Sequence, residues 1–166
     1  MNVTTPDWLP ELIDTDGSWD EILARLYSVF EDDFKNGHPR FAGLPVWWDR
    51  RCLEGDPHEE AFWHLVTQDD KTSGDRLPDL ARAKRLRWCR ATIDNGVPPD
   101  VLVFDYVEGK GNVRTYLWVH AWDYVVIMEK RLKQGLAFAY FLVTAYSLDG
   151  PSRRGSMQRK YDKRKT

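Results

Sequence analysis

The chain has 166 residues, of which 42% are hydrophobic and 13% aromatic, including 8 tryptophans. This length and composition suit one folded domain and exclude a disordered chain, and two cysteines, Cys52 and Cys89, are too few for a disulfide scaffold. No run of about 18 apolar residues is present, and the first residues lack the basic and apolar segments of a secretion signal. We therefore expect a cytoplasmic protein that does not enter a membrane, unless a larger carrier exports it.

The net charge of −2 hides an uneven distribution of charge. Residues 1–75 contain 17 acidic and 6 basic residues, whereas residues 76–166 contain 9 acidic and 18 basic residues. Such asymmetry suggests that the basic half meets a polyanion. It is equally compatible with two halves that pair with each other.

The first predicted helix begins at Ser18. Together with Glu21, three residues on, Ser18 forms a capping box in which each side chain can accept a hydrogen bond from a free backbone N–H. Apolar side chains follow at spacings of three and four, at Ile22, Leu26, Val29, Phe30 and Phe34. The helix is expected to end at Asn36-Gly37.

Shorter elements are expected after this helix. Prolines restrict Pro45–Asp49 to a short edge strand or an extended arm. Asp56 as N-cap, with Pro57 at the first helical position, predicts a short helix that ends near His64. The polar stretch from Gln68 to Pro78 is predicted to be a loop.

A second long helix is predicted from about Asp79 to Asn95, closed by Gly96. Its apolar stripe consists of Leu86, Cys89 and Ile93. Arg82 and Arg90 lie four residues before and after Leu86, so they flank this stripe. Two interpretations stay open: the arginines lie at the rim of the core, or they reach into a cleft and hold an anion.

The second half of the chain has the alternating pattern of β-strands. The predicted strands are Val101–Val107, Val113–His120, Tyr124–Lys130 and Phe138–Tyr146. Glu108–Asn112 and a turn that contains Gly135 are short connections, which makes the strand order antiparallel. The tail from Pro151 holds seven basic residues and one acidic residue. It is expected to be a short terminal helix or a frayed basic arm.

These elements predict a single α+β domain, with N-terminal helices packed on a C-terminal antiparallel sheet of about four strands. Its expected parts are an N-terminal arm (1–17), a helical half (18–100), an antiparallel sheet (101–149) and a basic tail (150–166).

Metal and nucleotide motifs are not recognisable in the sequence. His58 and His64 are six residues apart and differ by about 240° around a helix, so they cannot share one face as the histidines of H-E-x-x-H do. The glycine-rich signatures of nucleotide-triphosphate and dinucleotide sites are missing too. We therefore predict neither a metal nor a cofactor.

A histidine and a pair of hydroxyl groups are the candidates for catalysis. Imidazole suits proton transfer near neutral pH, although a histidine beside Trp63, as His64 is, more often packs in a core. Thr144 and Tyr146 project from one face of the last strand, which equally fits a solvated surface. Joined to a histidine and cations, they would supply the base, the phosphate donors and the stacking surface that phosphodiester cleavage needs.

Short motifs spread over about residues 26–161 strengthen this interpretation. They are Val29-Phe30 with Phe34, His38-Pro39, Pro45-Val46, Glu60–Thr67, Arg76–Ala83 with Arg85 and Trp88, Asp123–Val126, and Leu142–Tyr146. In this order they resemble the phage- and toxin-associated members of the barnase/EndoU/colicin/RelE-like nuclease superfamily. The resemblance implies helices before a four-stranded antiparallel sheet, and metal-free RNA cleavage through a 2′,3′-cyclic phosphate. Many such toxins are strongly basic, unlike this chain.

Carried over by position, the resemblance makes His64 the acid or base, and Thr144 and Tyr146 the phosphate and substrate contacts. Arg82 or Arg90 would be the anion clamp. The candidate substrate-binding cations are Lys130, Arg85 and Arg153. The implied protein is an endoribonuclease of toxin or prophage type with RNA as its partner, and it leaves open a cognate immunity protein or antitoxin.

Two non-catalytic functions stay open. The protein could be a phage or prophage protein that binds nucleic acid or a partner protein through the same sheet face and basic tail. Alternatively, the Trp-rich acidic half could be an interaction surface, for instance one that neutralises a host factor that binds DNA. That function predicts a large exposed aromatic patch and no cleft around His64.

Overall fold

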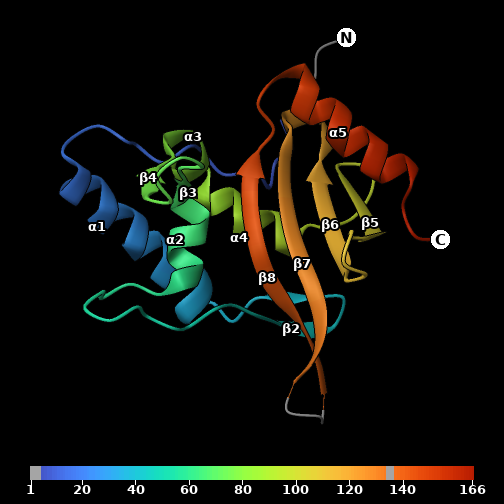
Figure 1. Ribbon diagram of the computed structural model, residues 1–166, viewed down its shortest axis with the longest axis horizontal. Helices are drawn as coiled ribbons and strands as arrows, with labels where there is room; N and C mark the ends of the chain where they lie inside the picture. The colour runs from blue at the N-terminus through green and yellow to red at the C-terminus, as the bar shows by residue number, and fades with distance from the viewer. Residues whose placement is uncertain (1–4, 134–136) are drawn as a thin grey trace.

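Six strands form a mixed sheet at the centre of the computed structural model, which describes residues 5–133 and 137–166 (Figure 1). Neighbouring antiparallel strands are β5 (Val101–Val107), β6 (Val113–Val119), β7 (Tyr124–Lys133) and β8 (Ala137–Ser147). β2 (Leu44–Trp47) pairs with β8 in parallel, and β1 (Arg40–Phe41) pairs with β2 at the edge. The α+β class is confirmed. The four-stranded antiparallel sheet is wrong in detail, because β1 and β2 make the sheet six-stranded and mixed.

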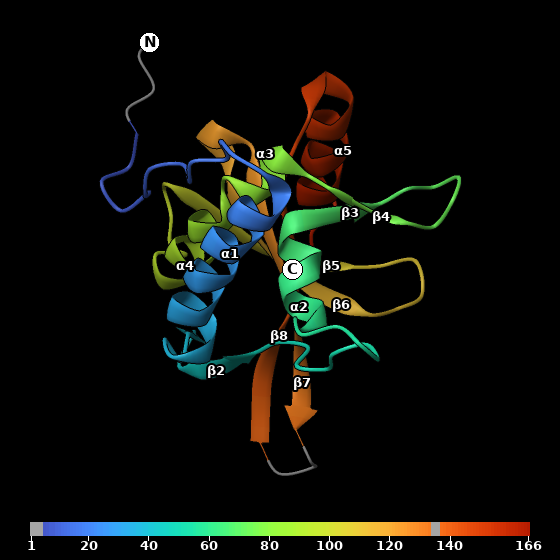
Figure 2. The same cartoon turned by 90° about the vertical axis from the view of Figure 1, so that its left-hand side faces the viewer.

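β8 changes from an internal strand to an edge strand along its length. β2 pairs with it only at Tyr140 and Phe141. Beyond these residues, α2 (Glu60–Val66) and α3 (Leu80–Ala83) lie against β8 in place of a strand (Figures 1 and 2). Because a strand edge carries unpaired backbone groups, this boundary between helices and sheet is a place where polar side chains can gather.

Helices cover the two faces of the sheet unequally. α1 (Trp19–Phe30) and α4 (Leu86–Asp94) pack on one face over the larger hydrophobic core. α5 (Gly150–Asp162) crosses only the upper end of the other face (Figure 1). Beneath α5 lies a second core of Phe104, Tyr116, Trp118, Val125, Ile127, Leu148 and Met157. In the described part of the chain, no helix combines the length and apolar character that a membrane crossing requires.

The first helix begins as predicted, because the Ser18 hydroxyl accepts a hydrogen bond from the Glu21 backbone N–H at 3.2 Å. After α1 the chain continues as a π-helical turn, η1 (Glu31–Lys35), up to the expected stop. The start of α2 was predicted wrongly. It lies at Glu60, because Asp56 accepts hydrogen bonds from the His58 backbone N–H and the Trp63 indole, each at 2.8 Å, in a turn before the helix.

The second long helix is interrupted. Asp79 is the N-cap as predicted and accepts from the Arg82 backbone N–H at 3.0 Å. However, the chain leaves the helical path at Lys84 and Arg85, so α3 and α4 are separate helices. This break gives Arg82 and Arg90 different neighbours.

Two polar segments are more ordered than the sequence suggested. The predicted loop from Gln68 to Pro78 carries a small hairpin of β3 (Thr67–Asp69) and β4 (Arg76–Pro78). The basic tail forms α5, whose Met157 and Tyr161 pack on the second core, so the helical alternative holds and the frayed arm does not. The predicted turn at Gly135 lies outside the described residues.

Asp33 lies in the π-helical turn, and its shifted pKa should make the free energy of unfolding depend on pH. Burial raises the pKa of its carboxyl group to about 6, although the positive charges of Arg90 and Arg87 oppose this. A raised carboxyl pKa means that the folded state loses stability as pH rises from about 4 to about 6. We therefore expect Asp33→Asn to raise the free energy of unfolding by about 1 kcal/mol at neutral pH, after allowance for solvent screening.

Denaturant unfolding at acidic and neutral pH measures this effect. The gain should vanish at about pH 3, below the pKa of both states, where Asp33 is largely protonated whether the chain is folded or unfolded. Asp32→Asn is the matched control, because the neighbouring Asp32 is exposed. A gain of equal size at both pH values would contradict the explanation.

Candidate functional site

The last turn of α2 is held between α3 and the edge of β8. Nη1 of Arg82 donates to the backbone carbonyls of His64 and Thr67, each at 2.9 Å. The Thr144 hydroxyl donates to the same His64 carbonyl at 3.3 Å. The final carbonyls of a helix have no partner within it, and here Arg82 and Thr144 supply one. Three segments far apart in sequence therefore meet at His64.

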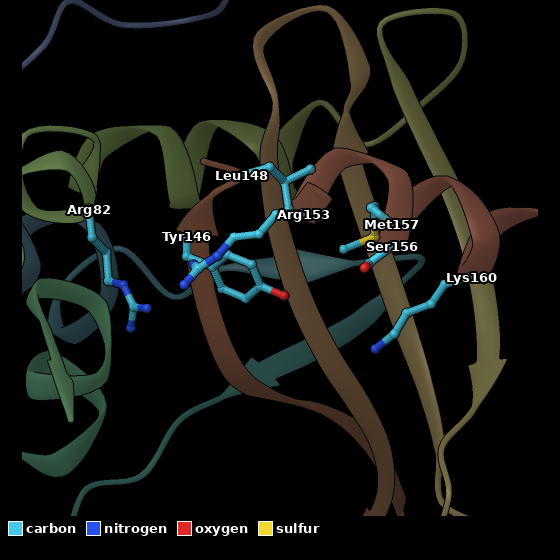
Figure 3. Close-up of a pocket in the computed structure, with 7 residues that line it drawn as sticks. All are labelled: Arg82, Tyr146, Leu148, Arg153, Ser156, Met157 and Lys160. Atoms are coloured by element: carbon cyan, nitrogen blue, oxygen red, sulfur yellow. The ribbon is translucent and has the colours of Figure 1, made fainter. Parts of the chain in front are cut away.

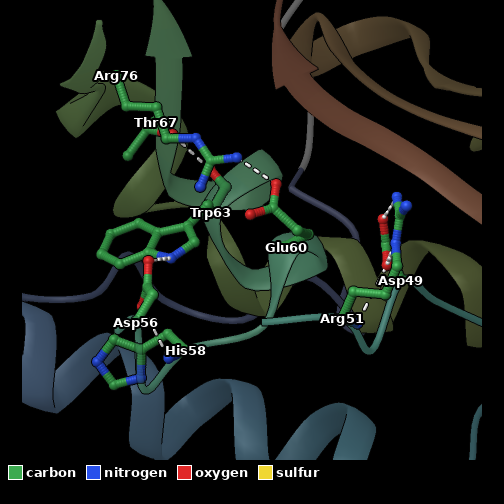
Figure 4. A network of polar contacts seen from close by, with 8 residues as sticks. All are labelled: Asp49, Arg51, Asp56, His58, Glu60, Trp63, Thr67 and Arg76. Carbon is green, nitrogen blue, oxygen red and sulfur yellow. Dashed lines mark hydrogen bonds and ion pairs between the residues drawn. The ribbon is translucent and has the colours of Figure 1, made fainter. Parts of the chain in front are cut away.

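The side chain of His64 is exposed, while its backbone carries these structural contacts. Its imidazole is near Asp49, whose pKa is lowered first by a hydrogen bond from Arg51 and to a smaller extent by the charge of His64. Glu60 lies one helical turn before His64 and pairs with Arg76 (Figure 4). The imidazole thus has solvent access and acidic neighbours.

A cavity of about 290 Å³ opens between α3, the end of β8 and α5 (Figure 3). It is lined by Arg82, Tyr146, Leu148, Arg153, Ser156, Met157 and Lys160. Three of these side chains are cationic, and no carboxylate is among the described residues that line it. An excess of positive charge together with hydroxyl groups is suited to an anion such as a phosphate.

Tyr146 forms the floor of this cavity as a neutral hydrogen-bond donor. Burial raises the pKa of its hydroxyl group, and the positive charges of Arg82 and Arg153 only partly oppose this. The Arg82 guanidinium carbon lies 5.6 Å from the centre of the tyrosine ring. At neutral pH the phenol therefore stays protonated, so it can donate to a phosphate oxygen and cannot act as a base.

Lys160 was missed by the sequence analysis. Its ammonium donates to the Tyr116 hydroxyl at 3.0 Å and lies 3.7 Å from the Glu108 carboxylate, to which Tyr116 itself donates. This network holds the ammonium at the cavity. Pro151 in the first turn of α5 was a signal for the helix that presents Lys160, because proline favours that position.

Four of the predicted catalytic residues meet and one does not. His64, Arg82, Thr144 and Tyr146 cluster around the end of α2, and only Arg82 and Tyr146 of these line the cavity. Arg90 lies elsewhere, because its guanidinium binds the Asp94 carboxylate at 2.9 Å and the Asp33 carbonyl at 2.6 Å. It therefore cannot be the clamp of this site.

The predicted substrate-binding cations are also split. Arg153 lines the cavity. Arg85 donates to the Ala81 carbonyl at 2.7 Å and lies over Trp88 instead. Lys130 lies over Phe138, 5.1 Å from the ring centre, on the far half of β7. Neither Arg85 nor Lys130 lines the cavity.

Neither a candidate metal site nor a comparison with known proteins adds residues to this site. Within residues 5–133 and 137–166, no group of three or more His, Cys, Asp and Glu side chains is arranged to hold a metal ion. The chain matches no protein-family model, no curated protein and no solved structure. Membership of the nuclease superfamily therefore stays a prediction from the short motifs.

Proposed function

We propose that the protein is a metal-independent endoribonuclease of toxin or prophage type that acts in the cytoplasm. The main support is that the backbone of His64 and the side chains of Arg82, Thr144 and Tyr146, up to 82 positions apart in the sequence, meet at the end of α2, and that Arg82 and Tyr146 line a cationic cavity there. An imidazole, hydroxyl donors and fixed positive charge are the groups that cleavage by the RNA 2′-hydroxyl requires. A cognate immunity protein or antitoxin belongs to the same proposal and rests on the resemblance alone.

In this mechanism His64 removes the proton from the 2′-hydroxyl. The 2′-oxygen attacks phosphorus, the bond to the 5′-oxygen breaks, and the leaving 5′-oxygen takes up a proton from solvent, to which the His64 imidazolium returns the proton that it removed. Arg82, Arg153 and Lys160 neutralise the charge that builds up on the phosphate, and Tyr146 donates a hydrogen bond to it. The products are a 2′,3′-cyclic phosphate and a 5′-hydroxyl. His64 itself does not line the cavity, so in this mechanism the RNA must extend from the cavity towards α2.

Product analysis tests this proposal directly. The purified protein should cut single-stranded RNA in the presence of EDTA and leave 2′,3′-cyclic phosphate ends. It should not cut the same strand when a 2′-deoxy sugar precedes the cleaved phosphate. Cleavage that EDTA abolishes, or cleavage of the deoxy strand, would refute the mechanism.

A non-catalytic nucleic-acid-binding protein is the second candidate, because His64 is not among the residues that line the cavity. It predicts binding with a steep salt dependence and no cleavage at excess protein. The function as an aromatic interaction surface has less support. Of the tryptophans, only Trp122, in the basic half, is exposed.

Tyr146→Phe should separate hydrogen bonding from packing in the cavity. Phenylalanine keeps the ring beside Arg82 and removes the hydroxyl, so we expect kcat to fall about 10-fold and the melting temperature to stay unchanged. Single-turnover cleavage and thermal unfolding measure the two quantities. An unchanged kcat would show that the phenol does not contact the reacting phosphate.

A further inference from the structure

One face of the sheet carries aromatic rings and cations beyond the end that α5 covers. Strand register places Glu129, Arg131 and Lys133 of β7 on the same face as Ile127, which lies opposite Thr144. Phe141 of β8 lies opposite Glu129 and is therefore on this face too. The face that holds the candidate site thus continues towards the β7–β8 hairpin.

Four side chains on this face form what we call the aromatic–basic strip, namely Trp47, Arg131, Lys133 and Phe141. Trp47 joins it because β2 pairs Trp47 with Phe141. The Lys133 ammonium lies 3.4 Å from the centre of the Trp47 ring, and the Arg131 guanidinium carbon lies 4.0 Å from that of Phe141. The four residues line a hollow of about 160 Å³.

The strip remains accessible and positively charged. Arg131 is exposed, and Trp47, Lys133 and Phe141 are partly exposed. The carboxylate nearest to Arg131 is Glu129, which it contacts at 3.1 Å and which lies 3.6 Å from Arg114. One carboxylate therefore does not neutralise the cations of this face.

We propose that the aromatic–basic strip binds the bases and phosphates of single-stranded RNA next to the cleaved phosphate. This inference rests on the proposed function, because it extends the substrate path of that site. Phe141 lies three residues before Thr144 on β8, and an irregularity at Val143 between them places both on this face, so an RNA strand that leaves the site along this face reaches the strip directly.

The chemistry of the strip favours a single-stranded nucleic acid. Bases stack on aromatic rings and on arginine planes regardless of sequence, while lysine and arginine pair with the phosphates. A partly exposed contact between a cation and a ring is weaker than base stacking, so a base can replace the Lys133 ammonium on Trp47. The displaced ammonium is then free to bind a phosphate.

Binding of an uncleavable oligonucleotide tests the inference separately from catalysis. The probe is a short fluorescein-labelled oligouridylate with 2′-O-methyl groups, which lack the attacking hydroxyl. Phe141→Ala and Trp47→Ala should each raise its dissociation constant about 10-fold, whereas Trp47→Phe, which keeps a ring, should retain most of the affinity.

The same hairpin offers matched controls on the opposite face. Lys130 is next to Arg131 in β7, and Phe138 lies opposite Leu132, so the side chains of Lys130 and Phe138 point to the face opposite the strip. Phe138 is exposed. Phe138→Ala should therefore leave the affinity unchanged. Arg131→Gln should lower the salt slope of binding by about one, and Lys130→Gln should not.

The outcomes separate the inference from the proposed function. If the parent protein does not bind the probe, or if Phe141→Ala and Trp47→Ala bind it like the parent, the inference is overturned even where RNA is cut. If these variants lose affinity and the controls do not, the inference holds. It then holds even where unmodified RNA is not cut, in which case only the proposed nuclease activity fails.

Discussion

Replacing His64 by alanine should lower the rate of RNA cleavage about 100-fold to 10,000-fold and leave the folded structure intact. The rate falls because no other group would take the proton from the 2′-hydroxyl. The fold is preserved because Arg82 and Thr144 bind the backbone carbonyl of this residue, which alanine also provides. Single-turnover cleavage and thermal unfolding of the same preparation measure both effects.

A second exposed histidine provides the control. His38 lies in a loop with a left-handed backbone, φ 46°, which asparagine tolerates well. His38→Asn should therefore remove an imidazole without affecting cleavage or stability. If His64→Ala cuts RNA at the parent rate, His64 has no part in the mechanism. A joint loss of activity and of melting temperature would point to a structural role.

Strands were easier to predict from this sequence than their partners. β5 to β8 have long alternating patterns and short connections, so their existence and order followed from local residues. The pairing of β2 with β8 involves only Tyr140 and Phe141 and joins segments about 90 positions apart. A short edge strand was one alternative predicted for Pro45–Asp49, but no local pattern encodes its parallel pairing with β8, so that pairing could not be predicted.

Two helix boundaries were predicted wrongly because polar groups near them have partners that the helix pattern does not show. The sequence around Asp56 and Pro57 is a good helix start, yet the Asp56 carboxylate accepts from the Trp63 indole and the helix begins later. The break at Lys84 and Arg85 likewise had no glycine or proline to signal it. At Asp56 a contact within the preceding turn overrode the capping signal, and at Lys84 the backbone carbonyl accepts a hydrogen bond from the distant Ile13 N–H at 2.8 Å.

The choice between Arg82 and Arg90 shows the same limit for the site. In sequence the two arginines are equivalent, because each lies four residues from Leu86. The break between α3 and α4 separates them: Arg82 turns to the end of α2, and Arg90 binds Asp33 and Asp94. Their residue types and spacing predicted an anion clamp on this segment, but only the fold distinguishes which arginine is available.

Arg82→Ala should reduce both stability and activity, because one side chain serves two purposes. Its guanidinium binds the carbonyls of His64 and Thr67, so its loss should lower the free energy of unfolding by about 2 kcal/mol. It also lines the cationic cavity, so cleavage should slow about 100-fold to 1000-fold. Arg82→Lys keeps the charge but not the forked geometry, and should recover only part of either loss.

Variants of Arg153 and Arg90 separate the structural role of Arg82 from its role in the cavity. Arg153 is exposed and lines the same cavity, so Arg153→Ala should slow cleavage without changing stability. Arg90 binds Asp33 and Asp94 outside the cavity, so Arg90→Ala should lower stability without slowing cleavage by the folded protein. Denaturant unfolding and single-turnover cleavage of all four variants give the comparison. If Arg90→Ala slows cleavage as much as Arg82→Ala, the cavity beside α3 is not where the phosphate binds.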